Sequence, residues 1–193
     1  MKRIVSIWFF AALLGLSAAA QAAPAAQAIP AATARNTFIV LKSGVGDIQV
    51  KDEFAINGLT EEQDIASAGL FAGYIFDSGF GIEAGFSGET SDDIFESYDV
   101  FQTIAMVVYT FRPATDFTIV PKLGVSMWEL DTFKSGFPFG ESEEHSYDGT
   151  DMIWSVEGEY SLTKLVQLNL SYTQGNYDFG DLDSYRLGVE FDF

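Results

Sequence analysis

The sequence predicts an all-β fold in which eight antiparallel strands follow one another up and down. Three observations lead to this prediction. From Thr37 onward the chain divides into short segments in which apolar and polar residues alternate. The connections between these segments are alternately short and long, and no segment holds the 3.6-residue apolar stripe of a helix.

The predicted strands are about ten residues long, which is the length that a tilted strand needs to cross the hydrocarbon of a membrane. Sparse proline, 18 glycines and 15% aromatic residues suit strands and tight turns. The predicted strands are 37–46, 65–77, 79–88, 98–112, 116–130, 150–161, 165–175 and 184–193.

Short turns and long loops alternate along the chain, so all the short turns fall at one end of the predicted strands and all the long loops at the other. Those at 77–79, 113–116 and 162–164 are tight turns built from turn-forming residues. Short turns at one end and long loops at the other are typical of a transmembrane up-and-down β-barrel, and are not expected of a sandwich with Greek-key crossings. The long polar connections are 47–64, 89–97, 131–149 and 176–183.

Alternation is clearest in 165–175, where Val166, Leu168 and Leu170 share one face and polar residues the other. The segments 37–46, 65–77 and 98–112 are apolar on both faces in places, so their parity stays open.

Aromatic residues gather near the strand ends, which favours apolar faces turned outward to lipid rather than inward as in a soluble barrel. Trp128 has the wrong parity for the outer face, and we expect it above the membrane or beside a bulge. One belt is Tyr74, Phe80, Phe111, Phe117, Tyr160 and Phe193, and the other is Phe86, Tyr98, Trp154, Tyr172 and Tyr185.

The N-terminus has the three parts of a secretory signal peptide. Lys2 and Arg3 precede an apolar run at 4–16 that is too short to span a bilayer, and Ala20-Gln21-Ala22 is a good cleavage site. We therefore expect a signal peptide at 1–22, a flexible Ala/Pro-rich leader at 23–36 and a barrel domain at 37–193.

Composition excludes several classes of function. The 28 acidic residues far outnumber the 10 basic ones, which argues against nucleic acid as a partner because phosphate binding needs clustered Lys and Arg. The absence of cysteine excludes disulfides and cysteine-ligated metals. We expect no cofactor and no metal site.

The last predicted strand, 184–193, resembles a known sequence signal. Its pattern of polar, glycine and two aromatic residues resembles the C-terminal assembly signal of bacterial outer-membrane β-barrels, with Arg186, Gly188, Phe191 and Phe193 at the defining places. The segment 74–86 is similar to the second hairpin of the small OmpA-type family, and the likeness covers nearly all of 37–193.

This resemblance implies a location in the bacterial outer membrane and recognition by the barrel-assembly machinery. The chain stops after the eighth predicted strand, so we expect no peptidoglycan-binding domain and carry over no cell-wall anchoring.

Alternation along the predicted strands turns several charged residues toward the interior of the barrel, and Arg112 is predicted near one end of it. The interior of an eight-stranded barrel is just wide enough for side chains to fill, so these charges should form an ion-paired network. We favour a static polar plug over a gate in which Lys122 or Arg186 switches partners. The predicted network is Glu83, Lys122, Glu157, Glu159, Arg186 and Glu190.

The other acidic residues are predicted to lie in the long loops. A solvated acidic surface explains them better than divalent cations that bridge to lipopolysaccharide phosphates, because no twelve-residue calcium loop is present. These residues are Asp52, Glu53, Glu61, Glu62, Asp64, Glu89, Asp92, Asp93, Glu96, Glu141, Glu143, Glu144, Asp148, Asp178, Asp181 and Asp183.

Catalysis is not expected. The single histidine, His145, is predicted in the middle of a loop, directly before Ser146. Lipid A deacylases of this size carry a His-x-Ser pair on a strand, and this chain departs from that pattern.

The sequence thus predicts a non-enzymatic outer-membrane protein with a structural or adhesion-like role. Its expected partners are outer-membrane lipid and lipopolysaccharide, the barrel-assembly machinery and an unidentified molecule at the cell surface. A narrow or gated pore is one alternative, and a soluble secreted barrel that binds a small apolar ligand is another.

Overall fold

The computed structural model describes residues 37–55, 61–91, 96–134 and 143–193, so the predicted signal peptide and leader lie outside the described residues. No helix in this part of the chain is long and apolar enough to cross a membrane. The strands are β1 (Thr37–Val50), β2 (Glu61–Ile75), β3 (Phe80–Ser91), β4 (Glu96–Tyr109), β5 (Phe111–Ala114), β6 (Phe117–Lys134), β7 (Glu143–Ser161), β8 (Val166–Tyr177) and β9 (Gly180–Asp192).

The sheet is antiparallel throughout and closes on itself. Neighbouring strands pair in chain order, and β1 also pairs with β9, with Leu41 opposite Val189. β4 pairs with β6, and β5 extends β4 after an interruption at Thr110, because Phe111 opposite Ile119 continues the register of the β4–β6 ladder. The result is the predicted eight-stranded up-and-down barrel, with β4 and β5 as one broken strand.

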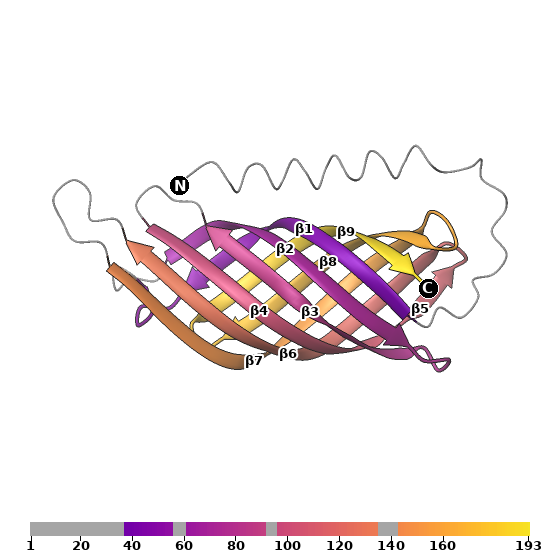
Figure 1. Ribbon diagram of the computed structural model, residues 1–193, viewed down its shortest axis with the longest axis horizontal. Helices are drawn as coiled ribbons and strands as arrows, with labels where there is room; N and C mark the ends of the chain where they lie inside the picture. Colours follow the sequence, from indigo (N-terminus) through magenta and orange to yellow (C-terminus); the bar gives the residue numbers. More distant parts are fainter. Residues whose placement is uncertain (1–36, 56–60, 92–95, 135–142) are drawn as a thin grey trace. The chain divides into compact units, whose positions relative to one another are not determined.

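The two ends of the barrel differ, as predicted. The short connections β2–β3, β5–β6 and β7–β8 lie at one end, together with the C-terminus (Figure 1). We call this the turn end. At the opposite end, which we call the hairpin end, β1, β3, β6 and β8 finish and β2, β4, β7 and β9 begin.

The strands at the hairpin end are longer than predicted. The ladder between β6 and β7 continues up to the pair of Lys134 and Glu143, through most of the predicted loop 131–149. The prediction ended each strand where apolar alternation stops. A backbone ladder does not need apolar side chains, so the hairpins continue with polar residues on their outer face.

Apolar side chains face outward and charged ones inward. Leu170 is 60% exposed, whereas Glu157 is fully buried and Arg186 is 2% exposed. A soluble barrel would show the opposite arrangement, since its apolar faces pack together. The outward apolar residues also include Leu41, Val45, Leu70, Ile82, Val107, Leu123, Met152 and Leu187.

One of the two aromatic belts lies where it was predicted. The six aromatic residues predicted at the turn end are all exposed on the outer face. Phe86, Trp154 and Tyr185 are exposed as well, but they lie near the middle of strands that run further than predicted. The prediction for Tyr98 was wrong, because its side chain is fully buried inside the barrel. β4 is apolar on both faces, so alternation alone could not tell which aromatic residue points outward. Phe101 holds the outer position and stacks on Phe86.

An aromatic cluster fills the interior toward the hairpin end. The side chain of Phe179, from the β8–β9 connection, is fully buried. Its ring centroid lies 4.7 Å from that of Trp128 and 4.9 Å from that of Tyr177. Trp128 was expected above the membrane or beside a bulge. It instead lies in a regular ladder opposite Gly149, with its ring turned inward and its Nε1 donating to Asp151 at 2.8 Å. Trp128 therefore occupies an inward position of the two-residue strand period. We call Trp128, Tyr177 and Phe179 the aromatic cluster.

Candidate functional site in the barrel interior

All six residues predicted for the interior network are buried inside the barrel. They come from β3, β6, β7 and β9, and each occupies an inward position of the two-residue strand period. They do not form one network. The structure brings Glu83, Lys122, Glu157, Glu159 and Glu190 together toward the turn end and places Arg186 in a separate cluster.

Two lysines and two glutamates form the first cluster. Lys122 Nζ lies 2.7 Å from Glu83 Oε2 and 2.8 Å from Glu157 Oε2. Lys42 from β1 donates to the same oxygen of Glu157. Its Nζ also lies 5.2 Å from the ring centroid of Phe71. Sequence reasoning missed Lys42 because the parity of its segment was open.

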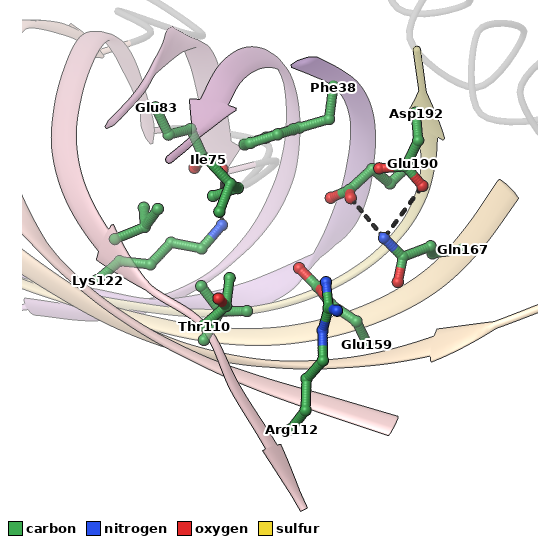
Figure 2. A pocket seen from close by; sticks show the side chains of 12 residues that line it. Phe38, Ile75, Glu83, Thr110, Arg112, Lys122, Glu159, Gln167, Glu190 and Asp192 are labelled. Atoms are coloured by element: carbon green, nitrogen blue, oxygen red, sulfur yellow. Dashed lines mark hydrogen bonds and ion pairs between the residues drawn. The ribbon is translucent and has the colours of Figure 1, made fainter. Parts of the chain in front are cut away.

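Carboxylates gather between this cluster and the turn end (Figure 2). Gln167 Nε2 donates to Glu190 Oε1 at 2.8 Å and to Asp192 Oδ2 at 3.2 Å. Glu159 is buried beside them, and the exposed Arg112 of β5 points toward Glu159 from the rim (Figure 2). A cavity of about 20 Å³ lies among these side chains, which is room for about one water molecule.

Arg186 anchors the second cluster. Its Nη2 donates to Glu89 Oε1 at 2.6 Å and its Nε to Ser67 Oγ at 3.1 Å. Gln102 Nε2 donates to the other oxygen of Glu89 at 2.9 Å, and Tyr177 Oη donates to Gln102 Oε1 at 2.6 Å. This cluster therefore joins the ion pair to the aromatic cluster. Glu89 was predicted in a loop, but β3 continues to Ser91 and turns Glu89 inward.

The histidine does not belong to a catalytic arrangement with its neighbour. His145 was predicted in a loop but lies in β7, where adjacent residues point to opposite faces. Ser146 Oγ instead lies 3.5 Å from Glu129 Oε1. Nucleophilic catalysis requires a base within hydrogen-bond reach of the nucleophile. His145 and Ser146 do not provide that geometry.

A closed antiparallel barrel with an apolar outer face, aromatic belts and a charged interior is the arrangement of an outer-membrane protein. A family model described as "Outer membrane protein beta-barrel domain" matches residues 9–193. The chain belongs to this family. It is accordingly a protein of the outer membrane. A search of curated protein sequences finds no match.

Solved structures share the fold of this outer-membrane barrel. Neisserial surface protein A is 12% identical, with a TM-score of 0.65 over 81% of this chain and 97% of that one. Ail, the attachment invasion locus protein of Yersinia pestis, is 15% identical, with a TM-score of 0.57 over 82% and 99%. The N-terminal barrel of Pseudomonas aeruginosa OprF is 14% identical, with a TM-score of 0.55 over 83% and 100%. At these identities the likeness shows the fold.

The acidic residues at the hairpin end of this outer-membrane barrel lie mostly in strands, where the prediction had loops. Asp47 of β1 stands opposite Asp64 of β2 and Asp183 of β9, on the outer face. On the other side of the barrel, Asp99 stands opposite Asp131. Like charges directly opposite one another destabilise a sheet, so these rows do not serve stability. Predicted loop acids that lie in β2, β4, β7 and β9 are Glu61, Glu62, Asp64, Glu96, Glu143, Glu144, Asp148, Asp181 and Asp183.

The four residues of the predicted assembly signal divide between the two faces of β9 and the end of the chain. Arg186 and Gly188 face the interior, whereas Phe191 and Phe193 face outward, and Phe193 is 74% exposed. The backbone N–H of Phe193 donates to the carbonyl of Thr37 at 2.9 Å, which ties the end of the chain to β1. The predicted loop acids Asp92, Asp93 and Glu141 lie outside the described residues.

Proposed function

We propose that this protein is a non-enzymatic structural and surface-interaction protein of the outer membrane. In this proposal the turn end faces the periplasm, as short turns do in outer-membrane barrels, and the hairpin end carries an acidic surface outside the cell. The filled interior is the observation on which the proposal depends, because it leaves the outer surface as the part that can act.

The interior is filled at two levels. Toward the hairpin end the aromatic cluster is packed and buried, and below it the Arg186 and Lys122 clusters occupy the cross-section with paired charges. A passing ion would have to separate these pairs in a medium of low dielectric, which is costly. The interior of an eight-stranded barrel is just wide enough for side chains to fill.

The hairpin end provides a surface for electrostatic binding. Exposed Glu129, Asp131 and Asp148 lie together on the outer face of the β6–β7 hairpin, since Glu129 and Asp148 are directly opposite. Such a surface attracts basic partners and repels polyanions. Ail has been solved in complex with the heparin analogue sucrose octasulfate. For this chain we expect no binding of that kind.

Planar-bilayer recording tests the closed interior. The purified, refolded protein should give no steady conductance, with at most rare small openings. A steady single-channel conductance in the wild-type protein would contradict a closed barrel and favour the pore.

Binding to an immobilised basic peptide tests the surface role. Wild-type protein should bind the peptide with an affinity that falls as salt rises, and should not bind sucrose octasulfate. The pair D131N and D148N should weaken peptide binding, whereas the matched pair D77N and D116N, which removes the same charge near the turn end, should not. Equal loss in both pairs would show that the hairpin surface has no special role.

A gated pore is the second candidate, and one observation favours it. Lys122 lies between two carboxylates, Glu83 and Glu157, at nearly equal distances. An exchange of its partner is the kind of two-state movement that a gate needs. If wild-type protein opens in bilayers, the openings should change in the variant E83Q. Openings that are the same in both proteins would exclude this gate.

Export and assembly complete the proposal. We propose that the signal peptide is removed after Ala22, that the assembly machinery recognises β9, and that lipid and lipopolysaccharide surround the barrel. N-terminal sequencing of the outer-membrane fraction should begin at Ala23. Phe193→Ala should lower the amount of folded protein in that fraction, while Phe133→Ala, on the outer face of β6, should not. Equal yields of the two variants would contradict recognition of β9.

A further inference from the structure

The turn-end half of the interior carries a surplus of negative charge among the described residues. Lys42 and Lys122 are buried there, and Arg112 lies at the rim. These three cationic groups face five carboxylates, so acidic side chains outnumber cationic ones by two in this half of the interior. Buried charge without compensation is unfavourable. The five carboxylates are Glu83, Glu157, Glu159, Glu190 and Asp192.

Three of these carboxylates converge on one point. Glu157 and Glu159 occupy successive inward positions of β7, and Glu190 faces inward from β9. One oxygen of each lies within 4.8 Å of the others. Oxygens that bind one calcium ion lie about 2.3–2.6 Å from it, so ligands on opposite sides are about 5 Å apart. The three oxygens therefore fit around a single ion.

A fourth side chain, on the strand between β7 and β9, has no hydrogen-bond partner. Asn169 of β8 is 1% exposed, and neither its Oδ1 nor its Nδ2 has a partner. Asn169 pairs with Glu159 of β7 and with Gly188 of β9. Glu157 and Glu190 occupy the next inward positions along those two strands. Gly188 leaves room there, because a Cβ at this position would collide with Asn169 Oδ1.

An oxygen of Glu157 is unpartnered as well. Glu157 is fully buried, and both lysines donate to its Oε2, while its Oε1 has no partner. Native structures rarely leave buried polar atoms unsatisfied. The orphaned Glu157 oxygen belongs to one of the converging carboxylates, and the orphaned Asn169 amide is on the neighbouring strand, directly opposite Glu159. These unpartnered atoms indicate that a ligand belongs there.

We propose that Glu157, Glu159, Glu190 and Asn169 hold a hard divalent cation, Ca²⁺ or Mg²⁺, inside the barrel. Carboxylate and amide oxygens are the ligands that these ions prefer. One divalent ion also offsets the surplus of two negative charges. Glu159 and Glu190 also line the small cavity at the turn end (Figure 2), so the proposed ion lies next to this cavity.

Calorimetric titration of the refolded full-length protein tests the site. The protein is stripped with a chelator and titrated with Ca²⁺ and, separately, with Mg²⁺. Wild-type protein should bind one ion per chain, and E190Q, which keeps an acceptor for Gln167, should bind it at least tenfold more weakly. The same ion should raise the temperature at which unheated gel mobility is lost in wild-type protein.

Two further variants make the test decisive. N169L removes the orphaned amide, so it should weaken ion binding while leaving the stripped protein as stable as wild type or more so. D64N removes a carboxylate from the outer acidic row and should leave ion binding within twofold of wild type. Absence of a saturable site for either ion, equal binding by E190Q and wild type, or equal weakening by D64N and E190Q would each overturn the proposal.

Discussion

Replacing Lys122 with methionine tests the buried charge network directly. The Lys122 side chain is buried and its ammonium lies 2.7 Å from Glu83 and 2.8 Å from Glu157. K122M leaves the Glu83 carboxylate buried without this ammonium, whereas Glu157 keeps Lys42. Removing one partner of a buried pair costs about 3–5 kcal/mol. We expect a loss of that size in the free energy of unfolding, which is roughly a hundredfold or more in the equilibrium.

A compensating variant separates lost packing from uncompensated charge. K122M with E83M replaces the pair by apolar side chains of similar size, and replacing a buried ion pair in this way is often neutral. The double variant should therefore recover most of the stability that K122M loses. The coupling between the two positions measures their interaction.

The assay is urea unfolding of the barrel in lipid vesicles, followed by unheated gel mobility and tryptophan fluorescence. Lys164→Met, at an exposed position of the β7–β8 turn, is the matched control and should change stability by less than about 0.5 kcal/mol. If K122M costs no more than the control, or if the double variant is as unstable as K122M, the buried pair does not carry the energy assigned to it.

Three further predictions concern the outer face, the β1–β9 contact and the aromatic cluster. Leu170→Arg should cost about 2–4 kcal/mol because it places a charge in lipid, and a neutral result would contradict an outward membrane face. Gly44→Ala should cost about 1–3 kcal/mol, since a Cβ there meets the backbone of β9, whereas Gly88→Ala has open space and should be neutral by the same urea assay. Phe179→Ala should cost about 3–5 kcal/mol and Phe133→Ala, which is exposed, less than about 1 kcal/mol; similar losses would mean that Phe179 does not pack as described.

The face of the strand to which each charged side chain points could be predicted from the sequence, because it depends only on local alternation. Alternation in β7 and β9 turns Glu157 and Arg186 to the face opposite the apolar residues, whatever the rest of the chain does. The same reasoning failed for Tyr98, because β4 has apolar residues on both faces. It failed for Trp128 because the prediction assumed an interior made of polar groups alone, whereas part of the interior is aromatic.

By itself, the sequence determined the number of strands, their antiparallel order, the inside-out polarity and the inward position of the charged residues. Only the tertiary structure decided which charges meet. Arg186 pairs with Glu89, 97 residues away, and Lys42 with Glu157, 115 residues away. Alternation states which face a residue occupies but not its height or its neighbours around the barrel. Those depend on the register of every strand pair at once, and closure of the sheet is what sets them.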